Sequence, residues 1–285
     1  MNDTQNYRME ILGCIGHPID ENPTAVMIAA AFNNLKLNHK YLMIDVDSSA
    51  LADAITGVKA FKMLGLNVTV PHKVNVIKYL DELDPLASMI GAVNTIVNDH
   101  GRLIGYNTDG LGFLQALNVN GIDITGKDVV ILGAGGAARA IAFSCLTNGI
   151  HKIHIINRSS ERGLGLVKSI RSAGGLAEFL EFVPGIKIPN TNIIVNATEI
   201  GMYPSTEIPP IDFDCIYPGQ IVCDVIINPP MTSFLRVAKS HGATIVDGLG
   251  MLVYQGARGI ELWTGKYPST NVMKESLLSC FETLN

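Results

Sequence analysis

A glycine-rich turn at 133–138 is the segment whose residue types and spacing point most directly to chemistry. It follows the apolar run DVVIL and opens a helix-like stretch. The first glycine of a GxGxxA turn permits a tight bend, the second lets a pyrophosphate approach the backbone, and the small last residue allows close helix packing. The helix N-terminus also attracts phosphate. The pattern predicts a dinucleotide site at Gly133, Ala134, Gly135, Gly136 and Ala137.

The end of the next apolar run indicates which dinucleotide would bind. NAD sites usually place Asp or Glu about 20 residues after the glycine turn to hold the ribose 2′-hydroxyl. This chain has Asn157-Arg158-Ser159 after HKIHII. Without a carboxylate to repel it, a 2′-phosphate could be held by the Arg158 guanidinium, the Ser159 hydroxyl and Arg162. We therefore expect NADP(H) as the cofactor, with NAD as the alternative.

Composition narrows the class of protein. The 285 residues are 47% hydrophobic and 16% charged, which is ordinary for a packed α/β enzyme. The formal charge of −5 argues against nucleic-acid binding, which usually needs a surface rich in Lys and Arg. The five cysteines are scattered, with no CxxC pair and no metal-ligand spacing, so we expect no metal. With no apolar signal core or membrane-length run, we expect a cytoplasmic monomer or homodimer acting on a small molecule.

The elements that must position these residues fall into two groups. The first group alternates expected strands (9–16, 39–47, 64–71) with expected helices (23–37, 73–83), which implies a mainly parallel sheet. Residues 95–107 predict a hairpin that turns at 98–101, and Thr108-Asp109-Gly110 predicts a helix start.

After Gly126-Lys127, a strand, glycine turn, helix and strand form a βαβ unit. The apolar runs at 192–198 and 220–227 predict further buried strands of that sheet, and the chain is helical from Gly248.

Several short segments, in order and spacing, resemble the shikimate/quinate dehydrogenase family over nearly the whole chain. Besides the glycine turn and Asn157-Arg158-Ser159, they are Gly16-x-Pro18-Ile19, NVTVPHK at 67–73, GAVNT at 91–95, Gly105-x-Asn107-Thr108-Asp109, NATEIGM at 196–202, and GLGMLVYQGA at 248–257 with WTG at 263–265. The resemblance implies an α/β fold with an N-terminal α/β substrate domain, a C-terminal Rossmann NADP-binding domain and a cleft between them. We expect the boundaries 1–109 and 110–246, with C-terminal helices over 247–285 packing back on the substrate domain.

The resemblance also assigns roles to residues. Lys73 and Asp109 match the family's catalytic pair, which implies acid–base catalysis with hydride transfer to or from nicotinamide. A secondary alcohol that loses hydride needs a proton acceptor at its hydroxyl, and a positioned lysine can exchange that proton. His72 is not expected to share this role, because adjacent side chains on a helix do not share a face.

Other matching positions are expected to bind substrate or cofactor. Asn67, Asn94 and Gln255 match residues that hydrogen-bond ring hydroxyls, and Thr69 matches one beside them; an amide suits a hydroxyl because it can both donate and accept. The matching segments also imply further cofactor contacts, at Ala197, Thr198, Gly201, Met202, Gly248 and Met251.

The chain departs from the family pattern where a substrate carboxylate would bind. The family's two carboxylate-binding serines correspond to Asn22 and Thr24, Asp20 and Glu21 add negative charge beside them, and a substrate-contacting tyrosine corresponds to Ile227. We expect reduction of 3-dehydroshikimate to shikimate or a close analogue, with quinate as a further substrate, and weak recognition of shikimate. Two alternatives stay open: a paralogue for a different cyclic polyol, and a non-catalytic NADP(H)-binding regulatory protein.

Overall fold

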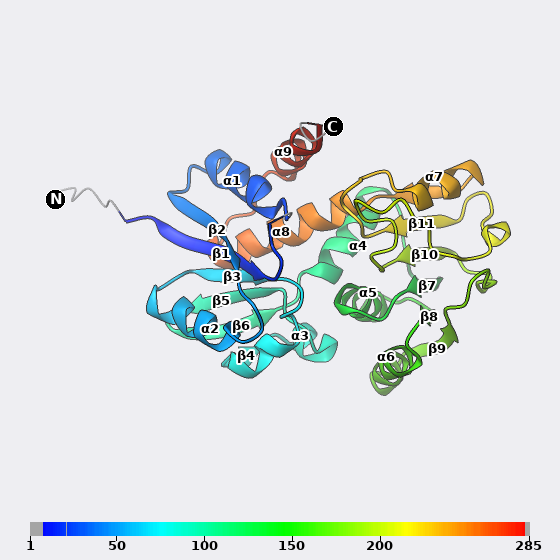
Figure 1. Ribbon diagram of the computed structural model, residues 1–285, viewed down its shortest axis with the longest axis horizontal. Helices are drawn as coiled ribbons and strands as arrows, with labels where there is room; N and C mark the ends of the chain where they lie inside the picture. The colour runs from blue at the N-terminus through cyan, green and yellow to red at the C-terminus, as the bar shows by residue number, and fades with distance from the viewer. Residues whose placement is uncertain (1–7, 21, 283–285) are drawn as a thin grey trace. The chain divides into compact units, whose positions relative to one another are not determined.

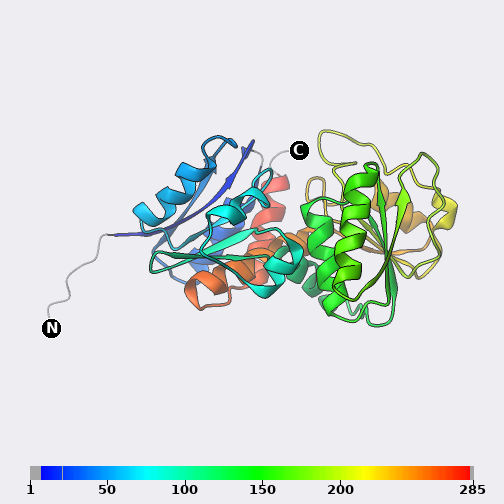
Figure 2. The ribbon, with the colours of Figure 1, turned by 90° about the horizontal axis from the view of Figure 1, so that it is seen from below.

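The structure is a computed structural model that describes residues 8–20 and 22–282. It divides into two compact units, each built on one six-stranded sheet (Figures 1 and 2). The first unit extends to Tyr106 and resumes at Gly256, and the second comprises Asn107–Gln255. The second boundary falls within helix α8 (Gly248–Thr264). No helix in the described part of the chain combines the length and apolar character that crossing a membrane requires.

The sheet of the first unit is mixed, with the order β2-β1-β3-β5-β6-β4. β1 pairs in parallel with β2 and β3, β5 pairs antiparallel with β3 and β6, and β4 is parallel to β6. The strands are β1 (Glu10–Gly16), β2 (His39–Asp45), β3 (Gly65–Val68), β4 (Glu82–Leu83), β5 (Thr95–Asp99) and β6 (Arg102–Tyr106). The predicted hairpin is confirmed as β5 and β6, and the Gly101 amide donates to Asn98 Oδ1 at 2.8 Å across its turn.

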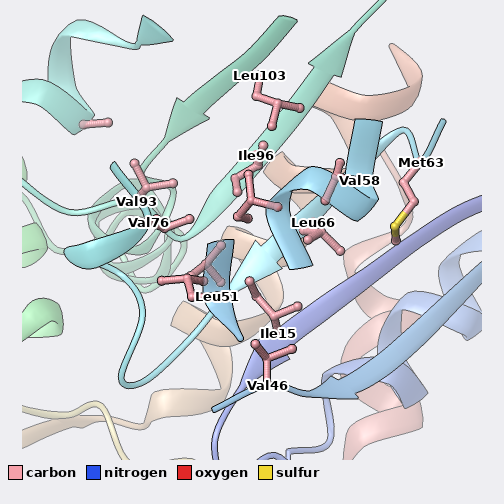
Figure 3. Packing of buried hydrophobic residues seen from close by; sticks show 13 residues of the cluster. Ile15, Val46, Leu51, Val58, Met63, Leu66, Val76, Val93, Ile96 and Leu103 are labelled. Carbon is pink, nitrogen blue, oxygen red and sulfur yellow. The ribbon is translucent and has the colours of Figure 1, made fainter. Parts of the chain in front are cut away.

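Helices cover both faces of this sheet. They are α1 (Thr24–Asn34), α2 (Leu51–Ala60), the 3-10 helix η1 (Asn75–Tyr79), α3 (Pro85–Ile90), the end of α8, and α9 (Thr270–Glu282). One face forms an aliphatic core with α2 and η1, in which Ile15, Leu66 and Ile96 are almost completely buried (Figure 3). Burying such side chains stabilises the unit by ~1.5–3 kcal/mol each. α9 packs against α1.

The predicted helix over 73–83 is wrong. The chain forms a turn, then η1, and then β4, whose Leu83 is the register partner of Gly105. The run Val-Asn-Val-Ile is rich in β-branched residues, which disfavour an α-helix. The Asp81 amide donates to Leu103 O at 2.9 Å, and its carboxylate accepts from the Leu103 amide at 2.7 Å. These two bonds to β6 replace the helical bonds that the segment would otherwise form.

The second unit has a fully parallel sheet with the order β12-β11-β10-β7-β8-β9. Its strands are β7 (Asp128–Leu132), β8 (Lys152–Asn157), β9 (Leu176–Glu181), β10 (Ile193–Asn196), β11 (Ile221–Asp224) and β12 (Thr244–Val246). Read from β9, the order is that of the Rossmann fold, in which the order of the strands reverses beside the first strand of the unit, β7. The predicted strands after the glycine turn are therefore confirmed.

The helices of the second unit are α4 (Asp109–Val119), α5 (Gly136–Thr147), α6 (Ser160–Ser172), α7 (Ser233–Ser240) and the 3-10 helix η2 (Phe213–Cys215). α5 and α6 lie on one face of the sheet and α7 on the other (Figures 1 and 2). Phe234 and Leu235 of α7 pack against Val130 and Ile194 in a buried cluster. Parallel strands buried on both faces place their carboxyl ends along one edge, where ligands of such sheets bind.

Candidate active site

The glycine turn joins β7 to α5 in the second unit. Gly133 has a φ of +112°, and its amide donates to Ile156 O at 2.7 Å. A Cβ at Gly133 would lie 2.9 Å from Ala197 O, so a side chain there would be both strained and crowded. Gly135 is exposed, and no described side chain caps α5. The first amides of α5 therefore carry no cap from a described side chain at the position where the sequence pattern predicts a phosphate.

The segment after β8 carries the groups expected at a 2′-phosphate. The Asn157 amide donates to Ser159 O at 2.9 Å, and Ser159 Oγ accepts from the Arg162 amide at 3.4 Å as the N-cap of α6. Arg158 and Arg162 are exposed, and neither forms an ion pair with another described residue. Both guanidinium groups can therefore turn toward an anionic ligand at this strand end.

The turn after β10 lies beside the glycine turn, at the point where the strand order reverses. The Ala197 amide donates to Leu132 O at 2.9 Å. The Thr198 hydroxyl donates to Asn196 Oδ1 at 2.6 Å, which keeps this turn compact. Gly201 is buried with a φ of +98°, whereas Met202 is exposed. Ala197 and Thr198 therefore share the carboxyl edge of the sheet with Gly133.

Asp109 and Gln255 are brought together in the second unit. Asp109 is the first residue of α4, is 6% exposed, and its amide donates to Asn107 Oδ1 at 3.2 Å. Thr108 Oγ1 donates to Gln255 Oε1 at 3.4 Å. A Cβ at Gly112, one turn after Asp109, would lie 2.6 Å from Met251 O, so only glycine allows α4 to approach α8 this closely. α4 also packs on α5, the helix that follows the glycine turn.

Asn67 and Asn94 belong to a buried polar network in the first unit. Tyr41 Oη donates to Asn67 Oδ1 at 2.6 Å. Asn67 Nδ2 donates to Asn94 O at 3.2 Å and to Thr95 Oγ1 at 3.0 Å, and Thr95 Oγ1 donates to Asn94 Oδ1 at 3.1 Å. The network therefore fixes which way both amides face. The sequence indicated no role for Tyr41, or for Thr95 within the matching segment at 91–95, because neither differs in type from an ordinary strand residue.

Burial excludes two neighbouring groups from acid–base chemistry at neutral pH. It raises the pKa of the Cys14 thiol to about 12 and places the pKa of Tyr41 well above its usual value. Cys14 is the register partner of Asn67 on the adjacent strand. Both groups therefore stay neutral and act as hydrogen-bonding or packing groups.

Lys73 lies in the turn between β3 and η1 and is half-buried. Its carbonyl accepts from the Val93 amide at 2.8 Å, which ties the turn to the segment before β5. His72 is fully buried, and its Nε2 lies 2.6 Å from Val46 O. Thr69 accepts through its carbonyl from the His72 amide at 2.9 Å. His72 is thus an anchor of the turn that carries Lys73.

The loop where the family pattern is broken is partly described. Asn22 Oδ1 accepts from the Thr24 amide at 3.0 Å, so this oxygen is engaged locally. Thr24 is 4% exposed at the start of α1, Asp20 is exposed, and Glu21 lies outside the described residues. Ile227 follows β11 and is half-buried. Asn22 and Thr24 contribute an amide and a β-branched hydroxyl, which are bulkier than serine.

The two units thus carry complementary chemistry. The first holds the Lys73 amine with an ordered pair of amides, and the second holds the Asp109 carboxylate, Gln255 and the dinucleotide turn. Within the described residues, no group of His, Cys, Asp or Glu side chains is arranged to hold a metal ion.

Comparison with known proteins covers almost the whole chain. Residues 14–96 match the model of the shikimate dehydrogenase substrate binding domain, residues 115–202 that of shikimate/quinate 5-dehydrogenase, and residues 248–278 that of the shikimate 5′-dehydrogenase C-terminal domain. The shikimate dehydrogenase (NADP+) of Methanococcus maripaludis is 42% identical over 284 residues, covering 96% of this chain and 99% of its own.

Two solved structures are similar throughout. Ligand-free 5-ketofructose reductase of Gluconobacter sp. strain CHM43 is 40% identical with a TM-score of 0.92, covering 97% of this chain and 100% of its own. A shikimate dehydrogenase in complex with NADP+ is 39% identical with a TM-score of 0.92, covering 97% of each chain. On the family models and on identity over almost its full length, the chain belongs to the shikimate/quinate dehydrogenase family.

Proposed function

We propose that the protein catalyses the NADP(H)-dependent, reversible reduction of 3-dehydroshikimate to shikimate or a close analogue such as quinate. The observation that carries the proposal is that a member of this family retains both Lys73 and Asp109, the matches to its catalytic pair. The first unit binds the substrate and the second binds the cofactor. The enzyme acts in the cytoplasm as a monomer or homodimer.

The cofactor assignment is supported by the groups at two strand ends. The amides that open α5 take the pyrophosphate, while Arg158, Ser159 and Arg162 take the 2′-phosphate. The further contacts proposed for the cofactor are Ala134, Ala137, Ala197, Thr198, Gly201, Met202, Gly248 and Met251. When bound, the reduced nicotinamide supplies a hydride to the carbonyl carbon of the substrate.

The protein's own residues handle the proton and the orientation of the substrate. As hydride reaches the carbonyl carbon, negative charge develops on the oxygen, and Lys73 donates a proton to it; in the reverse direction the neutral amine accepts that proton. Asp109 balances the charge of protonated Lys73 and restrains its position. Asn67, Thr69, Asn94 and Gln255 bind the ring hydroxyls, because amides and hydroxyls can both donate and accept.

A second candidate substrate is a neutral polyhydroxylated ketone. Three substitutions at Asn22, Thr24 and Ile227 remove the serines and the tyrosine that the family pattern places at a substrate carboxylate. The similar 5-ketofructose reductase is named for a substrate that is a ketose without a carboxylate. Weak recognition of a carboxylate together with an unchanged catalytic pair would favour such a substrate.

One experiment separates these substrates. NADPH oxidation is measured with 3-dehydroshikimate and with 5-ketofructose, for the wild type and for the triple variant Asn22→Ser, Thr24→Ser, Ile227→Tyr. We expect the triple variant to improve kcat/KM for shikimate-type substrates through KM, since each restored charged hydrogen bond contributes ~1.5–3 kcal/mol to ground state and transition state alike. A wild type with higher kcat/KM for 5-ketofructose would establish the second candidate. A micromolar wild-type KM for 3-dehydroshikimate would mean that Asn22 and Thr24 replace the serines as donors.

A further inference from the structure

Asp224, the last residue of β11, is a buried carboxylate that belongs to neither the proposed binding residues nor the proposed catalytic pair. It is 2% exposed, and no described lysine, arginine or histidine forms an ion pair with it. Three groups donate to it instead: Asn196 Nδ2 at 3.1 Å, the Ile226 amide at 3.1 Å and Thr232 Oγ1 at 2.7 Å. A carboxylate held only by neutral donors is unusual inside a protein and calls for an explanation.

Asn196 connects this carboxylate to the turn at 196–201. Its Nδ2 donates to Asp224 and, at 3.2 Å, to Ile200 O. Its Oδ1 accepts from the Thr198 amide at 3.1 Å and from Thr198 Oγ1 at 2.6 Å. All four hydrogen-bonding positions of the amide are therefore used, and a rotation of the Asn196 side chain would break several bonds of the turn at once.

Thr232 connects the carboxylate to α7. Thr232 Oγ1 donates to Asp224 Oδ2 and accepts from the Leu235 amide at 3.2 Å as the N-cap of that helix. Thr232 is completely buried. Asp224 thus joins the end of β11, the start of α7 and the turn at 196–201 in one network.

The turn at 196–201 lies where a dinucleotide would pass from one half of the sheet to the other. A Rossmann sheet consists of two mononucleotide-binding halves that meet at the reversal of strand order. The half built on β7, β8 and β9 carries the glycine turn and Arg158, which are suited to the adenosine end. The other half, built on β10, β11 and β12, would then bind the nicotinamide end. Its first turn is the segment 196–201, which the Asn196 side chain stabilises.

We propose that Asp224 is a positioning residue that holds the turn at 196–201 in the conformation that binds the nicotinamide half of NADP(H). The inference rests on the cofactor proposed above. Asp224 itself contacts neither cofactor nor substrate, and it acts through Asn196 and Thr198.

The energetic cost of this carboxylate supports such a role. Burial raises the pKa of Asp224 to about 6, although hydrogen bonds from Thr232, Ile226 and Asn196 favour its charged form. A charged group kept inside at neutral pH lowers stability, and groups with perturbed pKa values gather at functional sites. A role in ordering a ligand-binding turn would explain why the Asp224 carboxylate is kept despite its cost to stability.

The test compares two ligands on one variant. NADPH contains the nicotinamide half, whereas 2′,5′-ADP contains only the adenosine half with its 2′-phosphate. Asp224→Ala leaves the donors of Asn196 and Ile226 unpaired, so we expect NADPH binding to weaken at least about tenfold while 2′,5′-ADP binding is unchanged. Asp224→Asn can still accept from Asn196 and donate to Thr232, so it should restore most of the NADPH affinity.

Controls separate positioning from general damage. Asp212→Ala removes another aspartate of the same unit, one that caps η2 by accepting from the Asp214 amide at 3.1 Å, and it should change neither affinity. Binding is measured by calorimetry at a temperature at which circular dichroism shows the variant to be folded. If Asp224→Ala does not fold, the same two affinities are measured for Thr232→Val, which removes one of the donors to the Asp224 carboxylate.

The outcomes are distinct. An equal loss of both ligands, or no loss of NADPH in a folded variant, would overturn the positioning role. A wild type that binds 2′,5′-ADP but not NADPH would overturn it too, because the turn would then hold no nicotinamide. A wild type that binds neither ligand would instead refute the proposed cofactor.

Discussion

The buried carboxylate of Asp224 should make the second unit less stable as the pH rises through the weakly acidic range. Its pKa is raised to about 6 in the folded protein from an ordinary value of 3.8. The folded state therefore holds this proton more tightly than the unfolded state, and the stability that protonation provides is full below the ordinary pKa and is lost as pH rises to the folded one. A shift of this size corresponds to about 3 kcal/mol, of which about 2 kcal/mol falls between pH 4.5 and pH 7.5.

Asp224→Asn isolates this contribution, because the amide does not titrate. The melting temperatures of wild type and variant are measured by calorimetry at pH 4.5 and pH 7.5. Relative to the wild type, the variant should gain roughly 4–8 °C between these pH values, using 2–4 °C per kcal/mol for a protein of this size. Other acids affect both proteins equally and cancel in the difference. If the difference in melting temperature were the same at both pH values, Asp224 would titrate in the folded protein as it does when unfolded, and the argument from burial would fail.

Three further predictions concern the binding and catalytic residues. Arg158→Ala should reduce kcat/KM for NADPH roughly tenfold or more while sparing NADH, because a charge-assisted hydrogen bond contributes ~1.5–3 kcal/mol; equal losses in steady-state assays would place Arg158 away from the 2′-phosphate. Lys73→Ala should lower kcat by ~10²–10⁴ with NADPH affinity nearly unchanged, and retained turnover would remove Lys73 from the acid–base role. Tyr41→Phe leaves Asn67 Oδ1 without its donor at 2.6 Å, so it should cost ~1–3 kcal/mol in urea unfolding and raise the substrate KM more than it lowers kcat. An unchanged KM would show that Tyr41 does not orient the amide for substrate.

The sequence predicted the elements whose signals are local and strong. The glycine turn, the hairpin at 95–107 and the strands β7, β8, β10 and β11 of the second unit depend on spacing and turn chemistry that short segments encode by themselves, whereas β9 and β12 were not predicted. The segment at 73–83 was mispredicted because its conformation depends on the bonds between Asp81 and Leu103, which join residues far apart in the chain. Local propensity carries no information about such partners.

The residues of the candidate site fall into the same two classes: those with a local sequence signal and those that depend on long-range contacts. Cofactor residues beside the glycine turn follow from the motif, whereas Lys73 and Asp109 are ordinary residues until the family resemblance groups them. The networks around Tyr41 and Asp224 could not be found in advance, because a buried tyrosine or aspartate acquires its importance from tertiary neighbours. A polar residue at the end of an apolar run, as in IVCD, was the one local signal available for Asp224.

The most direct test of the proposed function is a steady-state assay of the purified full-length protein with 3-dehydroshikimate and NADPH, alongside Lys73→Ala. We expect oxidation of NADPH that depends on the substrate, is more efficient than with NADH, and is nearly abolished in the variant. Binding of NADPH without turnover of 3-dehydroshikimate would contradict the proposed reaction.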